Sequence, residues 1–126
     1  MAVQERQVAF DREDQLKQIQ SGLMQGEELF CVYDATGTGT GFVALTDHRV
    51  ILQNKSFVGN KIAMVSLPYS RIVEVGLLSN KSWMGNFFST SEVYVRTSGG
   101  DLHQMAFRGV DKAKYAHDLI LHYLTK

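Results

Sequence analysis

The stretch GEELFCVYDATGTGTGFVALTDHRVIL, residues 26–52, alternates short runs of β-branched and aromatic residues with residues that form turns. Its central glycines suggest a phosphate-binding loop, but such a loop leads into a helix, and its P-loop form carries a lysine. Here GTGTG leads into FVALT, which has the composition of a strand, and no GK[ST] sequence follows. The stretch therefore predicts consecutive strands, with GTGTG as a hairpin tip and TDHR as a tight turn.

The same alternation continues along the chain and predicts seven strands. They are expected at residues 28–35, 41–46, 49–53, 61–67, 72–78, 92–97 and 102–108. Because most connections between them are short, neighbouring strands are expected to pair antiparallel.

A helix is expected at each end of the chain. The first covers residues 11–24, with Asp11 as its capping residue. Its narrow apolar stripe is expected to pack either on the strands or on a neighbouring subunit, and consists of Leu16, Ile19 and Leu23. The second covers residues 111–125, with Asp111 as N-cap candidate. One face of this second helix is apolar and carries Tyr115, Ala116, Leu119, Ile120, Tyr123 and Leu124.

These elements predict one mainly β domain of the α+β class over the 126 residues. Its core is a seven-stranded antiparallel barrel over residues 28–108. A short barrel must hide its inner face, and one amphipathic helix of three or four turns has the size to cover a barrel mouth. The C-terminal helix is therefore expected to cap the barrel, and the N-terminal helix is an addition to it.

Three short pieces of sequence carry a resemblance to a known family. They are Gly26–Glu27 before the first strand, Leu45–Arg49 at the second turn and Pro68–Ile72 at the start of the fifth strand. Together with the order of the elements, they resemble the bacterial pleckstrin-homology-like domains over roughly residues 23–124. The resemblance implies a seven-stranded barrel capped by a C-terminal helix, no catalysis, and self-assembly into rings.

Composition argues against several classes of protein. The 13 basic and 13 acidic residues cancel, whereas nucleic-acid-binding domains usually carry excess positive charge. The one cysteine, Cys31, lies in the apolar run LFCVY and is expected to be a buried small side chain without a disulfide. No apolar run has the length of a signal peptide or a membrane span, so a cytoplasmic protein is expected.

Neither a metal site nor a catalytic centre is predicted. His117 and His122 are five residues apart on a helix and point in different directions, and His48 and His103 have no partner at ligand spacing. No G-x-S-x-G nucleophile elbow occurs. We therefore expect a noncatalytic protein without cofactor or metal.

Residues 79–91, SNKSWMGNFFSTS, join two predicted strands and carry an unusual apolar load for a loop. The residues concerned are Trp83, Met84, Phe87 and Phe88. Phe87 and Phe88 can begin the next strand while Trp83 folds over a barrel end. The loop can also anchor a subunit interface, where Trp, Met and Phe are enriched, or dip into a membrane interface. The sequence leaves these three interpretations open.

Basic residues are unevenly distributed. The first hairpin, residues 35–41, carries no positive charge, unlike eukaryotic pleckstrin-homology domains that bind phosphoinositides. A second set of basic residues lies in a segment whose only acid is Glu74, and consists of Arg49, Lys55, Lys61, Arg71 and Lys81. Three of them on one face would contribute about 3 kcal/mol at an anionic bilayer, less than the roughly 4.1 kcal/mol of a millimolar complex.

The function most consistent with these features is a noncatalytic interaction module that contacts an unknown protein partner and assembles into a homo-oligomer. The alternative is a peripheral protein that binds anionic lipid head groups weakly. Binding of nucleic acid is not expected.

Overall fold

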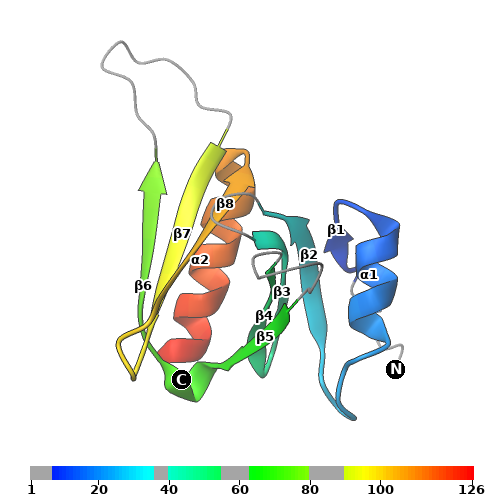
Figure 1. The fold of residues 1–126 in the computed structure, drawn as a ribbon, viewed down its shortest axis with the longest axis horizontal. Coiled ribbons are helices and arrows are strands. Elements are labelled where there is room, and N and C mark those ends of the chain that lie inside the picture. The colour runs from blue at the N-terminus through cyan, green and yellow to red at the C-terminus, as the bar shows by residue number, and fades with distance from the viewer. Residues whose placement is uncertain (1–6, 36–39, 55–62, 80–89) are drawn as a thin grey trace, which may run out of the picture.

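The computed structural model describes residues 7–35, 40–54, 63–79 and 90–126. Within these ranges it contains eight strands, two α-helices and one short 3₁₀ turn, η1 (Figure 1). The strands are β1 Ala9–Phe10, β2 Leu29–Asp34, β3 Thr40–Thr46, β4 Arg49–Asn54, β5 Ala63–Pro68, β6 Ile72–Ser79, β7 Thr90–Thr97 and β8 Leu102–Arg108. The helices are α1 Glu13–Gln20 and α2 Val110–Leu124, and η1 is Tyr69–Arg71.

The strands form two sheets, one with the order β1-β2-β3-β4-β5 and one with the order β6-β7-β8. From β2 onward every pairing is antiparallel, which confirms the seven predicted strands. The neighbours β5 and β6 do not pair, because η1 between them carries the chain from one sheet to the other. The strand β1, which pairs parallel with β2, was not predicted. A strand of two residues is too short to show a period-two pattern.

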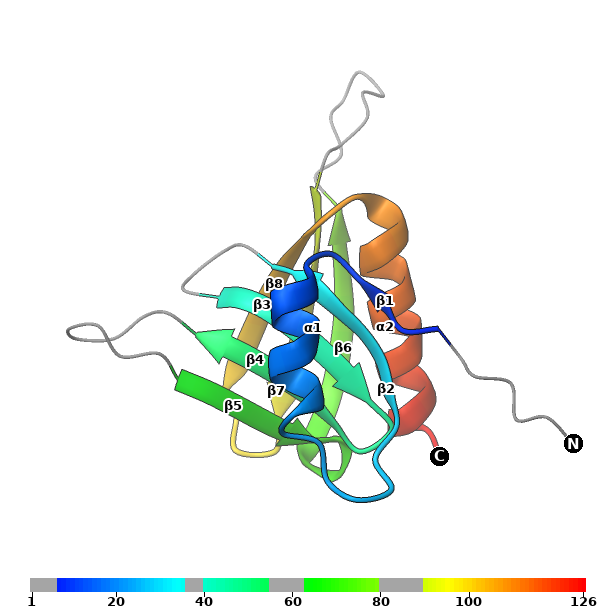
Figure 2. The same cartoon turned by 90° about the vertical axis from the view of Figure 1, so that its right-hand side faces the viewer.

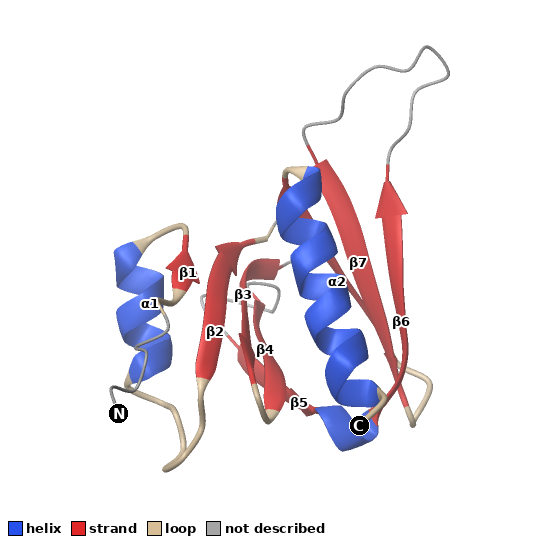
Figure 3. Ribbon diagram, turned by 180° about the vertical axis from the view of Figure 1, so that it is seen from behind, coloured by secondary structure: helices blue, strands red, loops and turns tan. Residues whose placement is uncertain are grey.

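The main core lies between the two sheets and α2 (Figure 3). Ala113, Ala116 and Ile120 of α2 are buried in it, and Leu119 and Tyr123 pack at its margin. The prediction that the C-terminal helix covers the barrel is therefore confirmed. Tyr115 was expected on the buried face but is 38% exposed, because it lies on the flank of α2, edge-on to the ring of Tyr33.

A second apolar cluster covers the opposite face of the five-stranded sheet. There α1 lies across the strands (Figure 2), and Ile19 packs with Val32 and Phe42 while Leu16 and Leu23 are partly buried. The narrow apolar stripe of α1 therefore packs on the chain's own sheet, which is the first of the two arrangements expected from the sequence. It also explains the continuous apolar run LFCVY, since β2 is buried on both faces.

The residues that cap the helices differ from the predicted ones. Asp11 does not cap α1; its carboxylate accepts a hydrogen bond from the backbone N–H of Asp34 and another from Lys112. It thereby ties the N-terminal segment to β2 and α2. At α2 the N-cap is Gly109, whose φ of 102° favours glycine, and Asp111 lies in the first turn.

Within the described part of the chain, the three-stranded sheet is covered on one side only. Figures 1 and 3 place α2 against its inner face, and no described helix lies over the other face. The side chains on that outer face include Leu78 and Leu102, which are 46% and 47% exposed. No helix of the described residues is long and apolar enough to span a bilayer.

On this outer face the ring of Tyr94 lies over Gly76, its cross-strand neighbour. A Cβ atom at Gly76 would lie 2.0 Å from the Cε2 atom of Tyr94, so the ring occupies the space of a missing side chain. The Tyr94 hydroxyl donates to Glu74 Oε2 at 2.8 Å, and Arg96 Nε donates to Glu74 Oε1 at 3.0 Å.

Gly76→Ala is therefore expected to displace the Tyr94 ring and break its hydrogen bond to Glu74. Gly99→Ala is the matched control, because no atom lies within 4 Å of a Cβ there and its φ is not positive. We expect a lower urea midpoint for Gly76→Ala than for Gly99→Ala. Equal midpoints would show that the ring moves aside at no cost.

Candidate functional site

The three pieces of sequence that carry the resemblance meet in one hydrogen-bonded cluster, here called the Glu27–Arg49 clasp. Glu27 Oε2 accepts from Arg49 Nε at 2.8 Å and from Thr46 Oγ1 at 2.6 Å. Its other oxygen, Oε1, accepts from Arg49 Nη2 and from the backbone N–H of Met24, both at 2.9 Å. The Glu27 side chain has no exposed surface, so this is a buried, two-pronged ion pair.

Further bonds join the neighbouring turns to the clasp. Asp47 Oδ1 accepts from the backbone N–H of Glu28 at 2.9 Å. The hydroxyl of Tyr69 donates to the carbonyl of Thr46 at 2.7 Å, and its backbone N–H donates to the carbonyl of His48 at 3.3 Å. The clasp thus fastens the start of β2, the β3–β4 turn and η1 to one another. Its contacts are internal, which indicates a role in the fold.

The hydrogen bonds from Arg49 lower the pKa of Glu27 to about 2, and those from Thr46 and Met24 act in the same direction. Burial opposes this shift, but the bonds outweigh it. Glu27 is therefore a carboxylate at neutral pH and is unsuited to act as a general acid.

Arg49 was predicted to contribute to an anion-binding surface. Its side chain is 18% exposed, and besides Glu27 it donates to Ser66 Oγ at 2.8 Å and to the carbonyl of Gly22 at 3.2 Å. Arg71, another member of the predicted surface, is exposed in η1. The remaining residues of the predicted surface, Lys55, Lys61 and Lys81, lie outside the described residues. So do the aromatic-loop residues Trp83, Met84, Phe87 and Phe88.

Cysteine and histidine side chains are the candidates for a nucleophile or a metal ligand. Cys31 is buried, and burial raises the pKa of its thiol to about 12, which keeps it protonated. His48 and His117 each lie beside an adjacent aspartate, with Nδ1–Oδ1 separations of 2.6 and 2.9 Å. Among the residues that the structure describes, no three His, Cys, Asp or Glu side chains form a group that could hold a metal ion.

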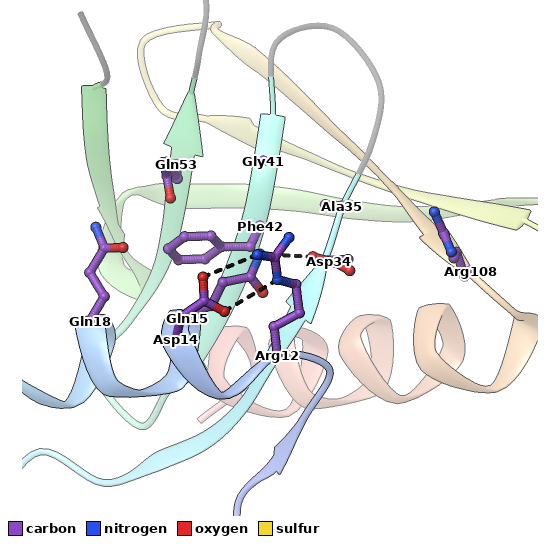
Figure 4. A pocket seen from close by; sticks show the side chains of 10 residues that line it. All are labelled: Arg12, Asp14, Gln15, Gln18, Asp34, Ala35, Gly41, Phe42, Gln53 and Arg108. Carbon is purple, nitrogen blue, oxygen red and sulfur yellow. Dashed lines mark hydrogen bonds and ion pairs between the residues drawn. The ribbon is translucent and has the colours of Figure 1, made fainter.

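A polar pocket of about 450 Å³ lies between α1, the start of β3 and the ends of β2, β4 and β8 (Figure 4). The size is within the usual range of ligand sites. Its lining consists of Arg12, Asp14, Gln15, Gln18, Asp34, Ala35, Gly41, Phe42, Gln53 and Arg108. None of these residues was predicted as a site residue. They come from five separate parts of the chain, so no local motif could have revealed them.

The two arginines of the pocket are in different states. The Arg12 guanidinium donates to both carboxylate oxygens of Asp14, from Nε to Oδ1 at 3.2 Å and from Nη2 to Oδ2 at 3.1 Å. Across the pocket, Arg108 has no ion pair or side-chain hydrogen bond within the described part of the chain. Asp34 accepts from Gln15 Nε2 at 2.8 Å. The pocket therefore contains two arginines and two aspartates, with one guanidinium available.

Comparison with solved structures places the fold. The chain is similar to a pleckstrin homology domain from Shewanella amazonensis SB2B, at 24% identity and a TM-score of 0.65. The alignment covers 92% of this chain and all of that one. The fold is pleckstrin-homology-like. The chain is also similar to the C-terminal domain of an unknown protein from Leishmania infantum, at 16% identity and a TM-score of 0.55, over 81% of this chain and 88% of that one.

No protein-family model and no curated protein matches the sequence. Within the PH-like fold, the pairs β2–β3 and β4–β5 belong to the first sheet, β6–β8 form the second, and α2 is the capping helix. The polar pocket lies outside the main core, between α1 and the five-stranded sheet.

Proposed function

We propose that this PH-like chain is a noncatalytic interaction module that self-associates through the outer edge of β6. The observation that carries the proposal is an eight-residue strand that, among the described strands, is paired on one side only, with β7. Its free edge leaves backbone N–H and C=O groups available to a strand of another chain.

The side chains along β6 support such pairing. Val73, Leu77 and Leu78 are exposed by 61%, 37% and 46%. Natural sheet edges are usually protected by lysine, by proline or by a covering segment. The first sheet shows such protection, since β5 ends at Pro68 and β1 covers β2. The one charged residue of β6, Glu74, is engaged by Tyr94 and Arg96.

Two copies can pair by these edges about a two-fold axis, with the same surface used on both. An antiparallel β6–β6 pairing would join two three-stranded sheets into one continuous sheet. The aromatic loop follows β6 directly in the sequence. We propose that Trp83, Met84, Phe87 and Phe88 belong to the same interface, because such residues are enriched at interface centres.

Light scattering tests this proposal. At tens of micromolar the natural chain is expected to be a dimer or a larger assembly. The double variant Val73→Lys with Leu78→Lys is expected to be a folded monomer, because charges on the edge oppose strand pairing. A natural chain that is monomeric would contradict the proposal.

Leu102→Lys serves as the control. Leu102 lies on β8, two strands away in the same sheet, and is as exposed as Leu78. This variant is expected to remain assembled. If it dissociates like the double variant, the outer face of the sheet forms the interface and the edge does not.

A further inference from the structure

We propose that the polar pocket between α1 and the five-stranded sheet binds the free C-terminal carboxylate of a peptide. This binding site is separate from the β6 edge and does not depend on self-association. The proposal rests on the charges of the pocket, its carboxamides and their arrangement.

The charges favour a singly charged anion over a doubly charged one. Asp14 forms an ion pair with Arg12, whereas Arg108 has no acidic partner in the described residues. A carboxylate would give the Arg108 guanidinium a two-pronged partner. The carboxylate of Asp34, which is bonded to the neutral Gln15, would repel any anion, but it would repel a doubly charged phosphate about twice as strongly as a carboxylate at the same distance.

The remaining polar groups suit a peptide backbone. Gln18 and Gln53 each present a carboxamide, which offers an acceptor oxygen and two N–H donors. A peptide group offers one acceptor and one donor, so a carboxamide can hydrogen-bond to either of them. Asp34 Oδ1 is bonded to Gln15, and its other oxygen can accept from a ligand N–H. A peptide end supplies both kinds of group, whereas inorganic phosphate lacks a series of amides.

Figure 4 shows how these groups are arranged. Arg108 lies on one side of the pocket, Gln18 and Gln53 lie on the other, and Asp34 and Phe42 are between them. A carboxylate held by Arg108 would direct the preceding residues past Asp34 toward the glutamines. Phe42 is 2% exposed, so its ring belongs to the core and offers little surface to a ligand.

The test uses the full chain and two forms of one probe, N-acetyl-trialanine with a free C-terminal carboxylate and the same peptide with a C-terminal amide. Chemical-shift changes are followed at the backbone amides of Ala35 and Gly41, which line the pocket. The carboxylate form is expected to bind at least about tenfold more tightly than the amide form, because only the carboxylate can form an ion pair with the Arg108 guanidinium. Arg108→Gln is expected to remove that difference.

Arg96→Gln is the matched control, because Arg96 is an exposed arginine on the adjacent strand β7 and does not line the pocket. It is expected to leave the preference unchanged. Equal binding of the two peptides, or no shift at Ala35 and Gly41 up to the solubility limit, would overturn the proposal. So would inorganic phosphate binding more tightly than the peptide in an Arg108-dependent way. The monomeric double variant at β6 is expected to keep the preference, which separates this test from that of self-association.

Discussion

Glu27→Gln is expected to lower the free energy of unfolding by about 3 kcal/mol at neutral pH, because removal of one partner of a buried ion pair leaves the other charge uncompensated. Gln has the shape of Glu and keeps an acceptor, but its amide group would face the donors of Arg49. The change therefore tests the charge of the clasp with little change in packing. The measurement is urea unfolding at pH 7.

The same variant is expected to change how the free energy of unfolding depends on pH in acid. The folded-state pKa of Glu27 is about 2, below its ordinary value of 4.5, so the folded chain binds this proton less readily than the unfolded chain. The stabilisation is therefore fully present above about pH 4.5 and is lost as the pH falls toward about 2. At about 1.4 kcal/mol per pKa unit, the total is again about 3 kcal/mol.

Unfolding curves collected between pH 7 and pH 2 separate Glu27 from other carboxylates. The natural chain is expected to lose stability more steeply than Glu27→Gln below about pH 4.5. Glu13→Gln is the control, because Glu13 and Lys17 form an exposed pair 3.6 Å apart on α1. Exposed pairs contribute about 0 to 1 kcal/mol. If the natural chain and Glu27→Gln lose the same unfolding free energy between about pH 4.5 and about pH 2, the clasp does not supply this stability.

Ile120→Ala is expected to lower the free energy of unfolding by about 3 to 4 kcal/mol, within the usual range for buried Ile to Ala changes. Ile120 lies on the inner face of α2 and is 0% exposed. Its removal opens a cavity where the helix meets both sheets, and close packing leaves few neighbours able to fill it.

Leu121→Ala is the matched control, since Leu121 is the next residue on the same helix and is 42% exposed. Helix propensity changes in the same direction in both variants, so the comparison isolates burial. We expect Leu121→Ala to change the free energy of unfolding by less than about 1 kcal/mol. Similar losses in the two variants would contradict the assignment of Ile120 to the core.

Much of the fold could be predicted from the sequence because its signals are local. The strand from Arg49 to Asn54 was expected one residue shorter, and the strand from Leu102 to Arg108 was expected with its observed bounds. The helix at the N-terminus was expected to extend to residue 24 but ends at Gln20, just before Ser21 and Gly22. The bond from the Gly22 N–H to the Ile19 carbonyl tightens this end into a shorter turn.

The candidate sites could be predicted only in part. Arg49 stood out as a basic residue, but its role depends on Glu27, which lies 22 positions earlier and meets it only after β2, β3 and β4 pair. Arg108 and Gln53 showed no pattern in the sequence, because the pocket that both line forms only when one sheet packs beside the other. The residues proposed for the β6 interface include four aromatic-loop residues that were singled out for their apolar character.

Hydrophobic period, glycine and turn chemistry act over a few neighbouring residues, and the order of strands and helices follows from them without knowledge of distant contacts. Which face of the N-terminal helix is covered, which charge neutralises Arg49 and where a polar cavity remains depend on residues far apart in the chain. Those properties are set when the two sheets and both helices pack, because burial and ion pairing act between whatever side chains that packing brings together.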